Sequence, residues 1–169
     1  NELDAIEVCR GYVEAQDDYV EKDRTGSGVL HYAQKIISSP GKHDGLYWTQ
    51  DAADDESPIG AIVARAFAEG YTKKHEPYHG YYFKILSAQG PHASGGEMTY
   101  LQNGLMTKGF GLIAWPSDYK STGIMTFIVD KAGIVYQKDL GPKTMEIAGA
   151  YAAYDPDETW SPVSTSARK

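Results

Sequence analysis

The stretch from His79 to Pro142 constrains the fold more than any other part of the chain. It contains four segments rich in aromatic and β-branched residues, each bounded by Gly, Pro, Asp or Ser: residues 79–89, 109–115, 123–129 and 133–140. Segments of this kind, separated by turn residues, are typical of antiparallel strands joined by short connections. The sequence therefore predicts an antiparallel meander of about four strands.

A long amphipathic helix is predicted at the start of the chain. Apolar side chains recur at spacings of three and four from Leu3 to Val20, and Asn1 is a suitable N-cap. The glycine-containing segment Asp23–Gly28 should end the helix near Lys22. A helix of about 20 residues is ~30 Å long, so it can lie along a whole sheet.

Two shorter helices are predicted on either side of the strand region. One should begin at Ser57-Pro58 and end at Gly70, because Ser is a good N-cap and Pro suits the first helical turn. The other should run over about 142–154 and pack through a set of apolar side chains: Met145, Ile147, Ala148 and Tyr151. We therefore predict a single α+β domain over residues 1–160, followed by a flexible C-terminal tail over 161–169.

The composition of the chain disfavours some classes of binding partner and excludes an intramolecular disulfide. With 16 Lys and Arg against 23 Asp and Glu, the net charge of -7 disfavours binding to nucleic acid or to anionic membrane surfaces. No stretch reaches the ~20 apolar residues of a membrane span, and no signal peptide is found at the start, where Asn1 stands instead of Met. The single cysteine, Cys9, excludes an intramolecular disulfide, and its place in a helical pattern favours a small buried hydrophobe over a reactive thiol.

One candidate site precedes the first predicted strand. It places two imidazoles, a carboxylate and a phenol close together in the sequence, as His75, Glu76, Tyr78 and His79. Imidazole and carboxylate groups are ligands for Zn²⁺ and Cu²⁺. Pro77 prevents the two histidines from lying one turn apart on a helix, so the alternative is an ordinary loop that leads into the strand.

A second candidate is a degenerate calcium-like loop after the first helix. Asp23, Thr25 and Ser27 place oxygen atoms at alternate positions before the glycine at position 28. Arg24 lies among these positions, and no carboxylate follows shortly after them. A turn that ends the helix is therefore the alternative to a calcium site.

Motifs for nucleophilic catalysis are missing from the sequence. No serine lies in a Gly-x-Ser-x-Gly pattern, and the histidines give no spacing that selects a catalytic partner. The 13 tyrosines and 3 tryptophans could line a binding surface, and Trp115 is included among the binding candidates. Aromatic residues inside strand patterns, Trp115 among them, are nevertheless more typical of a core. We predict no cofactor and favour a protein that is not an enzyme.

Several motifs carry a resemblance to a known family. They include Ser39-Pro-Gly-Lys-His-Asp-Gly-Leu-Tyr-Trp48 and the segments 78–86, 114–116, 123–129 and 135–142. On these segments the chain is identified as a member of the bacterial exported family known as domain of unknown function 2950, over nearly its whole length. The resemblance implies a periplasmic or extracellular location in Gram-negative bacteria and a longer precursor. The family usually has a more acidic loop than residues 23–28 of this chain.

A more distant likeness concerns the order of elements. A long N-terminal helix, a glycine-rich connection and a sheet containing Phe-Ile-Val-Asp-x-x-Gly-Ile-Val at 127–135 resemble the globular heads of type IV pilins and type II secretion pseudopilins. The favoured hypothesis is a non-enzymatic exported module that docks onto envelope or secretion-system proteins. The alternative is a periplasmic protein, for example a hydrolase, that binds a small molecule or a metal through residues 75–79.

Overall fold

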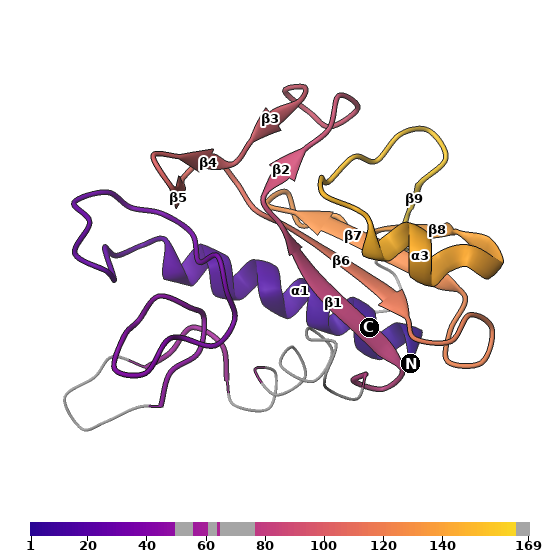
Figure 1. Cartoon of the computed structure of the whole chain (residues 1–169), viewed down its shortest axis with the longest axis horizontal. Coiled ribbons are helices and arrows are strands. Elements are labelled where there is room, and N and C mark those ends of the chain that lie inside the picture. Colours follow the sequence, from indigo (N-terminus) through magenta and orange to yellow (C-terminus); the bar gives the residue numbers. More distant parts are fainter. Residues whose placement is uncertain (50–55, 61–63, 65–76, 165–169) are drawn as a thin grey trace.

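A five-stranded antiparallel sheet with a long helix along one face forms the centre of the protein (Figure 1). The computed structural model of the chain describes residues 1–49, 56–60, 64 and 77–164. The helix is α1 (Glu2–Tyr19). The strands lie in the order β1 (Tyr81–Leu86), β6 (Gly111–Pro116), β7 (Met125–Asp130), β8 (Tyr136–Asp139) and β9 (Ser161–Pro162), each antiparallel to its neighbours.

Short elements extend and cover this sheet. Two small hairpins are formed by β2 (Ala88–Gln89) with β3 (Met98–Thr99), and by β4 (Leu101–Gln102) with β5 (Leu105–Met106). A 3-10 turn, η1 (Gly141–Lys143), leads into α3 (Thr144–Gly149). The β4–β5 turn has φ angles of 53° at Asn103 and 81° at Gly104, which is the left-handed pair that a two-residue hairpin loop requires.

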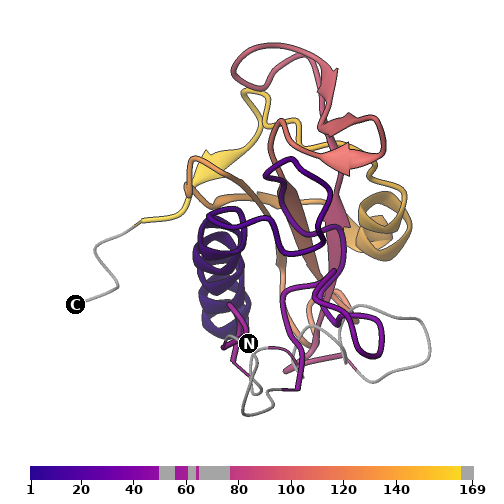
Figure 2. The same cartoon turned by 90° about the vertical axis from the view of Figure 1, so that its left-hand side faces the viewer.

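Both faces of the sheet are buried. Successive strand residues point to opposite faces, so the sheet supplies side chains to two separate cores. Figure 2 shows α1 on one side of the sheet and α3 on the other. The α1 core includes Cys9, Tyr12, Tyr81, Phe83, Leu112, Phe127 and Val129. The α3 core consists of Leu86, Ala93, Ile113, Trp115, Ile128, Ala148, Tyr154 and Trp160.

Helix α1 is attached to the sheet at its first residues. Asn1 occupies the N-cap position that the sequence predicts, but its side-chain amide donates to the Thr122 carbonyl (2.9 Å) and makes no capping hydrogen bond. A Glu2 carboxylate oxygen accepts the backbone N–H groups of Ile124 and Met125, both at 2.9 Å. The start of α1 is therefore held to the β6–β7 connection by polar contacts as well as by its apolar face.

Cys9 is part of the buried face of α1. Its side chain is fully buried, and burial raises the pKa of the thiol to about 12. The interpretation of Cys9 as a small buried hydrophobe is confirmed, and as the single cysteine of the chain it forms no intramolecular disulfide.

The predicted α+β class, the N-terminal helix and the antiparallel sheet are confirmed, with differences at the ends of the elements. α1 ends at Tyr19, before the predicted end at Lys22. The sheet has five strands where about four were predicted, because Ser161–Pro162 forms β9 against β8. The boundary predicted at residue 160 falls directly before β9, and the Val163 N–H also donates to the Val135 carbonyl (2.8 Å).

The two shorter predicted helices have different outcomes. The one predicted over 142–154 is α3, which begins after a 3-10 turn and ends at Gly149, short of the predicted 154. Ala148 is buried as predicted, but Met145 and Ile147 are 49% and 40% exposed, because so short a helix turns one side to the sheet. Most of the other helix, predicted from Ser57 to Gly70, lies outside the described residues, but within its range Ala64 is helical. None of the helices that the structure describes is long and apolar enough to cross a membrane.

Candidate functional site

Tyr78 and His79 lie at the turn that leads into β1. The His79 Nδ1 atom is 2.6 Å from a carboxylate oxygen of Asp4 on α1, and the imidazole stacks on the Tyr78 ring with centroids 4.1 Å apart. Their contacts therefore join the start of β1 to the first turn of α1. His75 and Glu76, the other members of this predicted site, lie outside the described residues.

Trp115 lies on the opposite face of the sheet from the α1 core. It is 9% exposed within the α3 core, and its ring is 6.0 Å from that of Tyr82 on the neighbouring strand. Its indole N–H and the Thr126 hydroxyl are buried without a hydrogen-bond partner in the described structure. The structure thus places Trp115 among core residues, away from the His79–Asp4 contact on the α1 side.

The calcium-like loop is organised around one carboxylate. Asp23 accepts the Ser27 N–H (3.1 Å) and hydroxyl (3.3 Å) at one oxygen and the Gly28 N–H (2.7 Å) at the other. The hydrogen bond from Gly28, followed by those from Ser27, holds the pKa of Asp23 below its usual range. The Thr25 hydroxyl lies 3.0 Å from a ring nitrogen of His31 instead. Asp23 and Ser27 are therefore hydrogen-bonded to each other while the Thr25 hydroxyl contacts His31, and the loop closes the end of α1.

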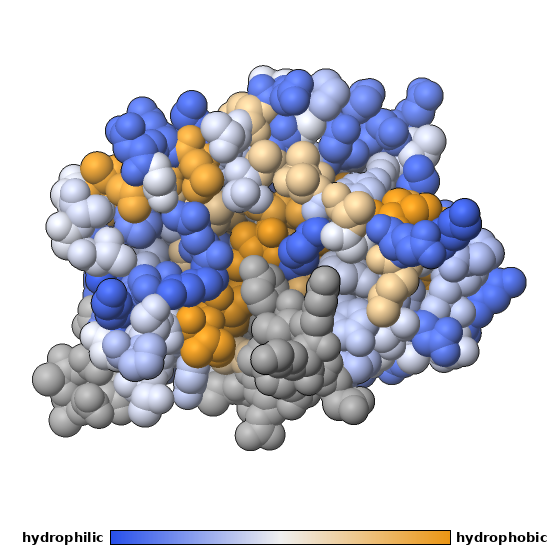
Figure 3. All heavy atoms as spheres, in the orientation of Figure 1, coloured by the Kyte–Doolittle hydropathy of each residue, from blue (hydrophilic) through white to orange (hydrophobic). Residues whose placement is uncertain are grey.

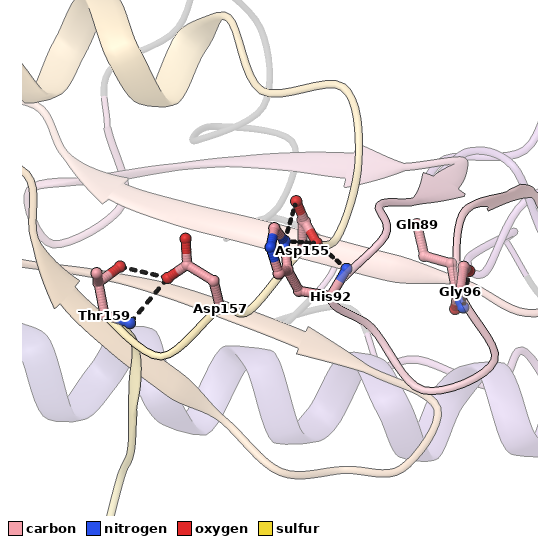
Figure 4. A network of polar contacts seen from close by, with 6 residues as sticks. All are labelled: Gln89, His92, Gly96, Asp155, Asp157 and Thr159. Carbon is pink, nitrogen blue, oxygen red and sulfur yellow. Dashed lines mark hydrogen bonds and ion pairs between the residues drawn. The ribbon is translucent and has the colours of Figure 1, made fainter.

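A polar network joins the loop at 90–96 to the C-terminal segment (Figure 4). The His92 backbone N–H donates to Asp155 at 2.8 Å, and the His92 ring nitrogen Nδ1 lies 3.1 Å from the same carboxylate oxygen. The Gln89 amide donates to the carbonyls of Ser94 and Gly96, both at 2.7 Å. These contacts fix the shape of the loop tip.

Asp157 lies next to this network. Figure 4 shows Asp157 turned toward Thr159 and not toward His92. Hydrogen bonds from the Thr159 hydroxyl and backbone N–H hold the pKa of Asp157 below its usual range. Among the residues that the structure describes, no three His, Cys, Asp or Glu side chains gather in a way that could hold a metal ion.

Two adjoining depressions lie in the loops that follow α1. One, of about 390 Å³, is lined by residues 37–43 and 47–49, and the other, of about 510 Å³, by Arg24, Thr25 and residues 41–44. The two depressions share Gly41, Lys42 and His43 in their linings. We call this pair of adjoining depressions the Arg24–Trp48 cleft.

The motif at 39–48 builds this shared lining through its backbone. The Ser38 N–H donates to the Tyr47 carbonyl (2.9 Å), and the Tyr47 N–H donates to the Ile36 carbonyl (2.8 Å). A Cβ on Gly45 would lie 2.8 Å from the Ser38 nitrogen, so the two arms of the loop approach closely only because residue 45 is glycine.

Asp44 stabilises the loop at residues 39–48 through hydrogen bonds and an ion pair. Its carboxylate accepts the Ser39 N–H (2.7 Å) and hydroxyl (2.9 Å) and pairs with the Lys35 ammonium (3.0 Å). Burial raises the pKa of Asp44, but the hydrogen bonds from Ser39 and Lys35 outweigh this effect and hold the pKa below its usual range. The carboxylate is therefore ionised and already partnered.

An aromatic and cationic cluster supports the cleft. The His43 and Trp48 rings stack with centroids 3.9 Å apart and planes 13° from parallel. The Arg24 guanidinium lies over the rings of Trp48 and Tyr19, at 5.5 Å and 5.3 Å from their centroids. The Tyr19 hydroxyl donates to the His43 carbonyl (2.6 Å), and burial raises the pKa of Tyr19 to about 12.

Sequence reasoning missed this cleft. From the sequence, residues 39–48 were used as a family motif and were not considered as a ligand-binding site. Arg24 was used only as an argument against calcium binding at residues 23–28. The available signal was a Gly-Lys-His run close to a tryptophan in an otherwise acidic chain. The contribution of Arg24 could not be found in this way, because a tertiary contact brings it to Trp48.

Comparison with known proteins places the chain in a family. No curated protein and no solved structure matches it, so the likeness to pilin heads stays a prediction. Residues 1–163 match the family described as Protein of unknown function (DUF2950). Because this match spans nearly the whole chain, the protein belongs to that family, as its motifs predict.

Proposed function

We propose that this protein is a non-enzymatic, exported module that docks onto another protein of the bacterial envelope, with an organisation like that of a pilin or pseudopilin head. The observation that carries the proposal is an apolar pair at the start of α1. Leu3 is 70% exposed, and Ile124 on the adjoining β6–β7 connection is 41% exposed.

Both residues line a shallow, wide-open depression formed by two distant parts of the chain. Residues 1–3 form one side, and residues 120–124 form the other. Scattered apolar side chains are normal on protein surfaces, but exposed apolar residues that gather at one place are typical of interaction sites. A partner that inserts an apolar side chain here would bury both Leu3 and Ile124.

Exposed apolar side chains also occur elsewhere on the surface. Figure 3 shows hydrophobic surface over α3, at the right of the view, where Met145 and Ile147 are 49% and 40% exposed. The start of α1 is the stronger candidate because its two sides are fixed to each other by the Asn1–Thr122 and Glu2–Met125 hydrogen bonds. A preformed surface loses less conformational entropy on binding than a surface that must be ordered.

Site-specific photo-crosslinking in intact cell envelopes tests the proposal. A photoreactive residue at position 3 should give a discrete crosslinked protein, and the same residue in place of exposed Lys108 should not. Ile124→Asp should abolish the adduct formed from position 3, because a charge would then face the apolar partner surface. Equal crosslinking from positions 3 and 108, or an adduct that Ile124→Asp leaves unchanged, would contradict docking at this surface.

A further inference from the structure

We propose that the Arg24–Trp48 cleft binds a small oxyanion ligand through a carboxylate or phosphate group. The cleft lies beyond the C-terminal end of α1, whereas the Leu3–Ile124 surface lies at its start. The two proposals therefore concern different surfaces, and each can fail without the other.

Arg24 supplies a buried charge with a weak counter-ion. Its side chain is 5% exposed, and its guanidinium donates to the carbonyls of Tyr19 and Asp18, both at 3.0 Å. Among the described residues its carboxylate partner is Asp18, which is 52% exposed and lies 3.6 Å away, longer than the ~2.7–2.9 Å of a charge-assisted hydrogen bond. Burying a cation without a close anion is unfavourable, and an oxyanion in the cleft would relieve that cost.

Lys42 supplies a second cation at the shared lining. It is exposed and lines both depressions beside His43. The carboxylate that also lines the cleft, that of Asp44, accepts hydrogen bonds from Ser39 and pairs with Lys35. Asp44 therefore has its own counter-ion and opposes an incoming anion only weakly.

The positive charge of the cleft contrasts with the negative charge of the chain as a whole. The chain has a net charge of -7, so a cleft lined by Arg24 and Lys42 is opposite in sign to the protein as a whole. Complementary local charge attracts and orients an anionic ligand. The His43 ring, held flat against Trp48, gives the cleft a rigid wall.

The dimensions of the cleft fit a small ligand. Depressions of about 390 and 510 Å³ are each within the range of ~300–1,000 Å³ that is usual for small-molecule sites. Arg presents a planar fork suited to carboxylate and phosphate oxygens, while Lys acts as a mobile point charge. We expect Arg24 to orient the oxyanion and Lys42 to increase its affinity.

Calorimetry with the whole chain at low salt tests the inference. The probes are inorganic phosphate, citrate and neutral glucose, which separate phosphate binding, carboxylate binding and binding without charge. Phosphate or citrate should bind with a dissociation constant of about 1 mM or lower, and glucose should not bind. Lys42→Gln should weaken the binding by about fivefold or more, and exposed Lys143→Gln should leave it within about twofold.

A second variant and a second readout locate the site. Arg24→Lys keeps the charge but loses the planar fork, so it should also weaken binding. Backbone amide chemical shifts should change on titration around residues 39–48 and Arg24, and they also report whether each variant is folded. No binding of either anion to the folded wild-type chain, or binding that Lys42→Gln does not weaken, would overturn the inference.

Discussion

At the scale of single residues, Gly90 shows how a missing side chain sets the shape of a loop. A Cβ at this position would lie 2.4 Å from the Asp155 carboxyl carbon, so only glycine lets that carboxylate reach His92. Backbone hydrogen bonds of Gly90 and Ala88 with Tyr154 also join the loop to the C-terminal segment, and the missing side chain at residue 90 makes room for the Asp155 carboxylate between them.

Gly90→Ala should lower the free energy of unfolding by about 1–3 kcal/mol, the usual range when an added group overfills a packed site. Urea denaturation measures this change. Gly149→Ala is the matched control, because nothing lies within 4 Å of its Cβ position, and it should leave stability unchanged or slightly higher. Equal effects of the two substitutions would show that the approach of Asp155 to residue 90 is unimportant.

The Asp23 carboxylate makes the loop after α1 sensitive to acid. Its pKa is depressed in the folded chain, mainly by the Gly28 N–H, below the unfolded value of about 3.9. A depressed pKa contributes stability above the unfolded value, and that contribution is lost as the pH falls through the folded pKa. Asp23 should therefore stabilise the fold at neutral pH and cease to do so in strong acid.

Asp23→Asn should lower the melting temperature at pH 6, and its difference from wild type should disappear as the pH is lowered through the folded pKa of Asp23. Thermal unfolding followed by circular dichroism over a pH series measures both. Exposed Glu97→Gln should show no comparable pattern. A difference that persists unchanged in strong acid would contradict this role of the Asp23 charge.

At the scale of elements, Gln16 joins α1 to the segment that follows it. Gln16 is fully buried, its amide donates to the Ala33 carbonyl (2.8 Å), and its side-chain oxygen accepts the Ala33 N–H (2.9 Å). The same amide lies 3.1 Å from the Tyr12 hydroxyl, which in turn donates to the Gly111 carbonyl of β6. One side chain thus satisfies both backbone groups of Ala33 where they are out of reach of water.

Gln16→Leu should lower the free energy of unfolding by about 2–4 kcal/mol, because Leu has a similar side-chain volume but leaves the buried N–H and carbonyl of Ala33 without partners. Chemical denaturation measures the loss. Glu14→Leu, at an exposed position on the same helix, should change stability by less than about 0.5 kcal/mol. If both variants lost the same stability, the bonds to Ala33 would not explain the burial of Gln16.

At the scale of the whole molecule, local sequence patterns were sufficient to predict the main helix and the main strands. The aromatic and β-branched runs predicted β1, β6, β7 and β8, and the apolar periodicity from Leu3 predicted α1. The helix signal succeeded because α1 buries one face at the helical period. The strand signal succeeded because aromatic and β-branched runs between turn residues favour strands even where both faces are buried, as in β6. β9 was missed because Ser161–Pro162 has no strand pattern and is defined only by its pairing with β8.

The candidate sites were less predictable because they depend on contacts between distant segments. His79 reaches Asp4 across 75 positions, and His92 reaches Asp155 across 63, so neither pair has a signature in local sequence. Trp115 falls in a strand pattern, which predicts that it is buried but not the face on which it lies. The contact of Arg24 with Trp48 likewise exists only after folding.

The attachment of α1 to the β6–β7 connection has a consequence for the order of events during synthesis. Asn1 bonds to Thr122 across 121 positions, and Glu2 bonds to Met125 across 123. α1 therefore leaves the ribosome long before residues 122–125 have been made. An isolated helix of this length is only marginally stable in water, and contacts so distant in sequence form slowly. α1 is thus translated before the strands that it packs on, and it can reach its final place only after they have been made.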